Sequence, residues 1–432
     1  MNHGSVHKFA LLALLVMSAP VTAEELPFGA TSVRAHTSHG RKFEYTPEQS
    51  FERTWQFIKD RNYDQSFGGQ DWDRWHHKYD GRLMTYDDAY KAIDTMLISL
   101  RLNPVQVDDH MRFCDYEWKW LPKGIGVGLT TDKSNRTLIS SIFANSIATG
   151  NASLLPGDII LAVNGKSMQG VVSQKMPNFI QGEPDSPVSI TVQRGPSVKT
   201  IQVRRNWSSS ALGPCGMIDE KIGYINIIDP SSYKMIEKVK EKLKSFADAS
   251  GLIIDLRATT CRSLFAQKNV ADFCDLFLTE GVTLSYQDFD GQHTQSAAPS
   301  VEYGGGLVIL VNDSVQGISE LIAGLLKDNG RAILVGEQTR GNPGSINSTF
   351  NIDTDTFCTL KSGHYNRISG KPFDQPLLPD ESISLTRHDY ETGKGPWWYM
   401  QSSLPSTELA IRDLQLIHAV DLLKQKSSSR RG

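Results

Sequence analysis

The stretch NDSVQGISELIAGLLKDNGRAILVGEQTRGNPGS, residues 312–345, alternates between two kinds of apolar pattern. Residues 318–330 have helical periodicity. A buried-strand pattern, GLVILVND (306–313), precedes them, and a second one, RAILVGE (331–337), follows. Upstream, IGYINIID (222–229) and GLIIDLR (251–257) flank another helical pattern at 233–246. Strands that alternate with helices predict an α/β layer with a largely parallel sheet.

The same stretch resembles the core of the carboxyl-terminal-processing (tail-specific) proteases. Those enzymes carry a serine nucleophile just before a Ser-Glu pair that opens a helix, and a lysine base in a Gly-Lys-Gly turn after the next strand. The pair here is Ser319-Glu320, so the nucleophile position falls on Gly317 and the base position on Asn342, 25 residues later. The resemblance implies a crotonase-like protease domain in which both members of the dyad are missing.

Serine–lysine chemistry needs a hydroxyl, a neutral amine that removes its proton, and backbone N–H groups that stabilise the oxyanion. A glycine offers no nucleophile, and the amide of an asparagine does not accept a proton near pH 7. The family's oxyanion loop, D-L-R-x-N-x-G-G, reads DLRATTCRSL (255–264) here, with Cys261 and Arg262 in place of the two glycines. Since the nucleophile, the base and the oxyanion loop are all changed, we expect negligible peptidase activity by this mechanism. Asp255 and Arg257 are expected to have structural roles.

A glycine-rich run and a hairpin signal mark a different kind of unit upstream. The string LPGDIILAVNGKSM (155–168) resembles a PDZ domain, in which a Pro-Gly-Asp turn leads into a strand and an Asn-Gly hairpin. KGIGVGLTTD (123–132) stands where PDZ domains place the loop that binds a terminal carboxylate. Successive backbone N–H groups of this loop must converge on one terminal carboxylate, and side chains in the loop would obstruct the approach of the carboxylate. The predicted peptide-binding residues are Gly124, Ile125, Gly126, Val127, Gly128 and Leu129.

Helical patterns also precede the PDZ-like unit. Phe51, Trp55 and Ile58 are spaced as one helix face, and a second amphipathic run covers 86–102, with Thr85 or Asp87 as its cap. Together these runs resemble the helical N-terminal segment of the same proteases, and the segment TPSGR…PDI and the last helix of the family have counterparts at 361–380 and 413–424. The resemblance therefore covers nearly the whole chain, in family order.

These patterns predict six segments and a crotonase-like α/β fold with an inserted PDZ domain. They are a signal peptide at 1–23, a flexible linker at 24–45, a helical N-terminal domain at 46–116, a PDZ domain at 117–207, a protease-like α/β domain at 208–425 and a flexible tail at 426–432.

The composition and the amino terminus indicate where the protein acts and what it does not bind. A basic start, the apolar run FALLALLVMSAPV (9–21) and a small-residue ending predict cleavage after Ala23 and a periplasmic location. No later stretch is apolar enough to span a membrane. A net charge of −3 gives no sign of a nucleic-acid partner. The five cysteines match no zinc pattern, so no metal or cofactor is expected, although some should pair in an oxidising compartment.

Three functions remain open from the sequence. The first is a pseudoprotease that binds protein C-termini through its PDZ domain. The second is an active endopeptidase that uses another nucleophile, for which Cys261 with His293 or His364 as base is the candidate; a buried or paired thiol is the more common role for such a cysteine. Ser319 is expected to cap its helix instead of reacting. The third is a structural partner in an envelope complex, for which an active relative is the candidate partner.

Overall fold

A computed structural model describes thirteen stretches of the chain. The ranges are 44–100, 106–107, 124–144, 146, 154–173, 175–205, 210–232, 234–257, 259, 267–353, 356–399, 404–405 and 411–429. The predicted signal peptide, nearly all of the predicted linker, and Cys114, Cys261 and Arg262 lie outside these residues.

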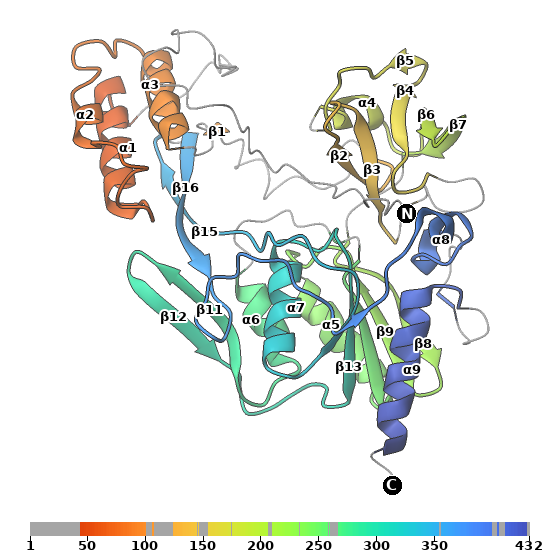
Figure 1. Ribbon diagram of the computed structural model, residues 1–432. Helices are drawn as coiled ribbons and strands as arrows, with labels where there is room; N and C mark the ends of the chain where they lie inside the picture. Colours follow the sequence, from red (N-terminus) through yellow and green to blue (C-terminus); the bar gives the residue numbers. More distant parts are fainter. Residues whose placement is uncertain are drawn as a thin grey trace, which may run out of the picture.

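A six-stranded sheet forms the centre of the larger α/β unit (Figure 1). Its strand order is β17-β14-β13-β10-β9-β8; all neighbours are parallel except β8 and β9, so the predicted, largely parallel sheet is confirmed. The strands are β8 (Leu212–Asp219), β9 (Ile222–Ile227), β10 (Gly251–Asp255), β13 (Gly306–Val311), β14 (Ile333–Gly336) and β17 (Glu381–Ser382).

Helices cover both faces of this sheet because its strands are apolar on both sides. Ile254 and Ile309 pack in one cluster with residues of α5, α6 and α7, whereas Ile253 and Val308 pack in another with residues of α9. The helices are α5 (Met235–Ser245), α6 (Gln267–Asp275), α7 (Ile318–Asp328), α8 (Arg387–Glu391) and α9 (Leu414–Ser429). Residues 426–429 are thus helical, where the sequence predicted part of a flexible tail.

A second sheet carries the N-terminal helices. Its order is β1-β16-β11-β12, with β15 also paired to β16. Trp55 and Ile58 pack with Cys358 and Leu360 of this sheet in one cluster, so the helical segment docks on it. The elements are α1 (Pro47–Arg61), α2 (Asp73–His76), α3 (Tyr86–Ser99), β1 (Gln106–Val107), β11 (Val282–Asp288), β12 (Gly291–Ser296), β15 (Ile346–Asn351) and β16 (Thr356–Tyr365). Thr85 caps α3, as predicted, and β1 is a strand inside the segment predicted as helical.

The third unit has the expected PDZ arrangement of short strands. Its sheet order is β2-β3-β4-β6-β7, with β5 paired to β4. Asn164 and Gly165 have φ angles of 49° and 76° between β4 and β5, which confirms the predicted Asn-Gly hairpin, because a two-residue primed turn requires positive φ. The elements are β2 (Val127–Thr131), β3 (Thr137–Ile142), β4 (Ile159–Val163), β5 (Lys166–Ser167), α4 (Pro177–Ile180), β6 (Pro187–Arg194) and β7 (Ser197–Arg204).

An aromatic segment joins the PDZ unit to the central sheet. The indole N–H of Trp398 donates to the carbonyl of Ile142, at the end of β3 (2.8 Å). Trp397, its neighbour, donates from its indole N–H to the Tyr224 hydroxyl on β9 (3.1 Å). The two tryptophans are almost fully buried, and their hydrogen bonds join the PDZ unit to the central sheet.

A buried ionic network lies beneath this junction. The Arg257 guanidinium donates to Asp255 (2.6 Å) and to Asp413 (2.8 Å), and all three side chains are fully buried. Tyr224 also donates to Asp255 (2.8 Å). Asp413 in turn accepts the Leu416 N–H at the start of α9 (3.1 Å), so the network ties β10 to α9. The structural roles predicted for Asp255 and Arg257 agree with these contacts.

Replacing Arg257 by methionine should leave two buried carboxylates without a cation. We expect the free energy of unfolding to fall by about 3–5 kcal/mol, the usual cost of breaking a buried ion pair from one side. Urea denaturation followed by circular dichroism at pH 7 measures it. Arg387→Met is the control, because the Arg387–Glu391 pair is exposed and its loss should move the midpoint little. Equal losses in the two variants would contradict a central role for the network.

Candidate functional site: a closed elbow and an open strand edge

Gly317 forms the sharp turn between β13 and α7. It is the N-cap residue of α7, with φ 61° and ψ −140°, and no side chain caps the helix. Side chains other than glycine are strained at such angles, and strained positions of this kind recur where an enzyme holds a nucleophile on a strand-to-helix turn. The structure therefore has the geometry of a nucleophile elbow with glycine at its tip.

The structure brings Gly317 and Asn342 together. The N–H of Gly317 donates to the carbonyl of Asn342 with an N···O distance of 2.7 Å. The two positions at which the family would place its nucleophile and base are therefore joined through the backbone. An N–H that already has this partner is not available to a developing oxyanion.

The Glu320 carboxylate holds the turn that contains Asn342. It accepts the N–H of Gly341 (2.7 Å) and of Asn342 (2.8 Å), and also the Thr339 hydroxyl. Glu320 is fully buried, and burial raises its pKa, while these hydrogen bonds act in the opposite direction. We call this arrangement the Glu320 clamp. The sequence identified Glu320 only as part of a motif, because its partners lie 19–22 residues away.

The serines near the elbow all have local partners. Ser319 is fully buried and its hydroxyl donates to Thr259 (2.8 Å), so the predicted role as a helix cap is wrong: the side chain faces the oxyanion-loop segment instead of its own helix end. Ser314 donates to Asn312 (2.7 Å) and Ser345 to Asn347 (3.0 Å). None of these hydrogen bonds supplies a base that would activate the hydroxyl.

The described thiols and imidazoles offer no alternative dyad. Cys215, Cys274 and Cys358 are free, and burial raises each thiol pKa, to about 11 for Cys215 and about 12 for Cys358, which keeps them protonated at neutral pH. His293 pairs with Asp288 (2.9 Å), and His364 lies edge-on to Tyr63, with burial lowering its pKa. Cys261 and Arg262 lie outside the described residues.

Two carboxylates and an arginine lie around the ends of β13 and β14. Asp313 remains accessible to solvent, but the protein around it still removes part of its hydration, which raises its pKa. Burial raises the pKa of Glu337 too, and the Asp313 charge adds to the effect. Glu337 accepts the Leu385 N–H (2.9 Å). Burial lowers the pKa of Arg340, whose buried Nε has no hydrogen-bond partner among the described residues.

The predicted carboxylate-binding loop leads into a strand that pairs with a neighbouring strand on one side only, among the residues that the structure describes. β2 is the outermost strand of its sheet. The Phe143 N–H donates to the Gly126 carbonyl (3.0 Å), so Val127 and Ile142 form a pair that exchanges no hydrogen bonds, and the N–H of Val127 points away from β3. Gly126 has φ 75°, and no hydrogen bond between described residues uses its N–H.

The remaining loop residues support this edge. Ile125 is buried in the PDZ core, and its carbonyl accepts the Ser146 hydroxyl. Leu129 is half-buried, and Gly124 has open space around it. A Cβ at Gly128 would lie 2.4 Å from the Ser141 hydroxyl oxygen, so this glycine permits the close approach of β2 to β3. The loop and strand together present outward-directed N–H groups to an extended chain.

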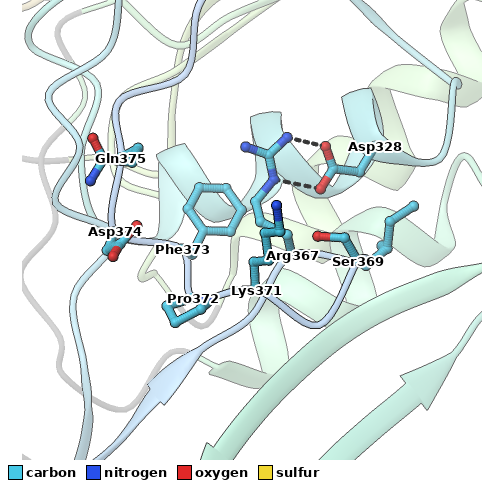
Figure 2. Close-up of a pocket in the computed structure, with 9 residues that line it drawn as sticks. Asp328, Arg367, Ser369, Lys371, Pro372, Phe373, Asp374 and Gln375 are labelled. Atoms are coloured by element: carbon cyan, nitrogen blue, oxygen red, sulfur yellow. Dashed lines mark hydrogen bonds and ion pairs between the residues drawn. The ribbon is translucent and has the colours of Figure 1, made fainter.

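A pocket of about 520 Å³ opens at the other end of α7 (Figure 2). The Arg367 guanidinium and the Asp328 carboxylate, which form an ion pair, line it together with Phe373. Asp328 lies eleven residues after Gly317, about 16 Å along a helix axis. The pocket is therefore not where the dyad would stand.

Within the described stretches, no group of three or more His, Cys, Asp and Glu side chains is placed to hold a metal ion. Over the same residues, none of the helices combines the length and apolarity that crossing a bilayer requires.

Known proteins match the chain in the same two units. Residues 221–383 match peptidase family S41, and residues 119–193 match the PDZ domain. A solved photosystem II D1 C-terminal processing protease superposes with a TM-score of 0.60 at 20% identity, covering 78% of this chain and 93% of that one. A putative S41 protease from Bacteroides fragilis does so with a TM-score of 0.50 at 13% identity, covering 87% and 97%. The fold is that of an S41 peptidase with a PDZ domain and N-terminal helices.

Curated relatives cover most of the chain. A carboxyl-terminal-processing protease of Picosynechococcus sp. is 28% identical over 403 residues, which is 89% of this chain and 91% of the relative. Carboxyl-terminal-processing peptidase 2 of Arabidopsis thaliana is 26% identical over 361 residues, or 77% and 68%. The chain is thus similar to carboxyl-terminal-processing proteases over most of its length.

The raised pKa values at the elbow predict a pH dependence of stability. A carboxyl whose pKa is higher in the folded than in the unfolded state stabilises the fold below its unfolded pKa, and this contribution is lost as pH rises through the folded pKa. Asp313→Asn removes one of the two carboxyls with a raised pKa. It also removes the negative charge that helps to raise the pKa of Glu337. We expect its urea midpoint to fall less than that of the wild type between pH 4.5 and pH 7. The exposed Asp290→Asn serves as control, and an unchanged slope in Asp313→Asn would contradict the coupling.

Proposed function

We propose that this protein is a periplasmic pseudoprotease of the carboxyl-terminal-processing family that captures protein C-termini through its PDZ domain. It performs no serine–lysine chemistry. Its partners are proteins or peptides with a free terminal carboxylate, and it acts on them as an adaptor, decoy or regulator. A nucleic-acid partner, a metal and an organic cofactor have no part in this function.

One observation carries the loss of peptidase activity. The Gly317 N–H donates to the Asn342 carbonyl at 2.7 Å, at the point where a hydroxyl and an amine should meet. The Glu320 clamp holds that turn from the other side. Removing a serine nucleophile alone typically lowers turnover by about six decades. The base and, from the sequence, the oxyanion loop are changed as well.

Tail capture is supported by the free edge of β2. A terminal carboxylate needs convergent N–H donors, and an extended tail needs an unpaired strand beside it. The N–H groups of Gly126 and Val127 are the candidate donors to the carboxylate. The outer position of β2 provides the strand beside which an extended tail can lie. The periplasmic location rests on the predicted signal peptide, and the fractionation of a Gram-negative host that expresses the full chain tests it. Pairing with an active relative remains a prediction from the sequence alone.

The purified protein should not degrade casein or a tailed protein above the buffer rate, with an active family member run in parallel. Gly317→Ser with Asn342→Lys should not restore turnover. A serine at φ 61° carries strain of about 1–3 kcal/mol, and its N–H would keep the backbone carbonyl of residue 342 as partner. Turnover that Cys261→Ser or Ser319→Ala abolishes would instead establish the endopeptidase alternative.

A peptide with a free C-terminal carboxylate should bind more tightly than its amidated form. Hydrogen bonds to a charged group are worth about 1.5–3 kcal/mol, so we expect roughly a 10- to 100-fold difference in Kd. Fluorescence anisotropy with a labelled tail measures it.

A matched pair of variants locates the binding site. Gly126→Ala strains the carboxylate loop, whereas Gly165→Ala puts the same residue at almost the same φ, 76° against 75°, in the hairpin between β4 and β5. We expect Gly126→Ala to weaken binding and Gly165→Ala to leave it unchanged. Equal affinity for acid and amide, or no binding of either, would overturn terminal capture.

A further inference from the structure

A second pocket, of about 410 Å³, opens at the edge of the central sheet where the parallel strands begin. Residues 304–307 at the start of β13, residues 330–333 between α7 and β14, and Leu423 and Lys426 of α9 form most of its lining. Figure 1 shows that this end of α9 lies away from the PDZ unit. Small-molecule sites usually measure about 300–1,000 Å³, so the pocket is large enough for a small ligand. It is not part of the elbow, which follows the opposite end of β13.

The lining of this pocket contains two cations and no carboxylate. Arg331 donates from Nε to the Phe277 carbonyl (2.8 Å) and from Nη2 to the Tyr303 carbonyl (3.0 Å). Both acceptors are uncharged, so these hydrogen bonds orient the guanidinium without neutralising its charge. Lys426, which is exposed, reaches the pocket from the last turns of α9. Glu302, the carboxylate nearest in sequence to the glycines at the start of β13, lies outside the lining and pairs with a lysine of α5 (3.2 Å). The pocket is therefore positively charged.

The glycines that precede β13 leave backbone donors unused. Gly306 donates its N–H to the Ser250 carbonyl (3.0 Å), but no hydrogen bond between described residues uses the N–H of Gly304 or of Gly305. A Cβ at Gly305 would overlap the Tyr303 hydroxyl, so glycine permits the close approach of this run to Tyr303. Successive backbone N–H groups in such a turn are a common means of binding an anion.

The ordinary role for a cation beside a helix end is to offset the partial negative charge of the last carbonyls. Lys426, in the last turns of α9, fits that role. At the end of α7, however, the N–H groups of Arg331 and Ala332 already donate to the Leu326 carbonyl (2.9 and 3.2 Å), so this carbonyl does not need the guanidinium. Two cations and two unused N–H groups at one cavity go beyond the capping of a helix end.

We propose that this pocket binds a small anion through its phosphate or carboxylate group, and that Arg331, Lys426 and the N–H groups of Gly304 and Gly305 hold that group. Hydrogen bonds from guanidinium and ammonium groups to such oxygens are about twice as strong as neutral ones. The cavity is larger than one oxyanion, so the organic part of a ligand has room beside Leu423. The site lies outside the PDZ domain and does not depend on tail capture.

Isothermal titration calorimetry of the full-length protein at constant ionic strength tests the site, with inorganic phosphate, glycerol 3-phosphate, succinate and glycerol as probes. We expect saturable binding of at least one anion and none of glycerol, which is neutral. A lower Kd for glycerol 3-phosphate than for phosphate would support a phosphorylated ligand, equal values would support free phosphate, and a lower Kd for succinate would support a carboxylate. No saturable binding of any anion, or equal binding of glycerol, would overturn the inference.

A matched pair of lysines on α9 locates the anion. Lys426→Gln removes one cation of the pocket, whereas Lys424→Gln removes a lysine that lies outside the lining and pairs with Asp219 (3.0 Å). Since a hydrogen bond to a charged group is worth about 1.5–3 kcal/mol, we expect Lys426→Gln to raise the Kd roughly tenfold. Lys424→Gln should leave the Kd nearly unchanged. Equal losses in the two variants would indicate general attraction to the basic end of α9 and would contradict the proposed site.

A second pair of variants tests the glycine run without removing a cation. The heavy atom nearest to a Cβ at Gly304 is a Val301 carbon 3.9 Å away, so a side chain fits there. Gly304→Asp adds a negative charge beside the pocket, and Gly304→Asn adds the same shape without the charge. We expect the aspartate variant to bind the anion at least several times more weakly than the asparagine variant. Equal Kd values in these two variants would place the anion elsewhere and overturn the inference.

Discussion

The backbone hydrogen bond from Gly317 to Asn342 is the constraint on which the functional interpretation depends. It is local in space but joins two turns that follow different strands of the central sheet, β13 and β14. The parallel pairing of those strands brings both turns to the same sheet edge, where open α/β folds place their sites. The Glu320 clamp fixes the second turn against the first helix turn of α7. On the proposed assignment, the fold holds the nucleophile and base positions in contact but supplies neither a hydroxyl nor an amine there.

Glycine at the elbow also has a stability consequence. A nucleophile held at φ near 60° stores strain that an active enzyme tolerates for the sake of geometry. Gly317 adopts the same backbone without that strain. If Gly317 stands at the nucleophile position, as we propose, glycine there removes the nucleophile and relaxes the turn at one step. The buried Arg257 network and the Trp398 contact with β3 are independent of this change, so the protein keeps the junction between its sheet and its PDZ unit.

Much of this architecture could be predicted from local sequence patterns. Apolar runs with Ile and Val at 222–229, 251–257 and 306–313 predicted the parallel strands, Asn164-Gly165 predicted a hairpin, and Thr85 predicted a helix start. Each signal lies within a few residues of the feature that it specifies. The family resemblance then supplied the positions of Gly317 and Asn342, which spacing alone would not have connected.

The features that the sequence did not reveal depend on long-range contacts. The second sheet includes β12, whose polar residues GQHTQS show no apolar alternation because this edge strand is largely exposed. The Glu320 clamp and the hydrogen bonds between Thr131 and Ser173 join residues that are 19 or more positions apart. Ser319 has the residue type of a cap, yet tertiary packing turns its hydroxyl toward Thr259. Side-chain polarity alone does not specify such partners.

We propose that the protein holds a C-terminal tail and leaves that tail uncleaved. Mass spectrometry of an apolar-ended peptide, kept for a day at saturating concentration with the purified protein and then released, tests both in one sample. We expect a peptide with a free carboxylate to be retained on the protein and recovered at full length. Recovery of shortened peptide, in amounts that grow with time and with protein concentration, would contradict it.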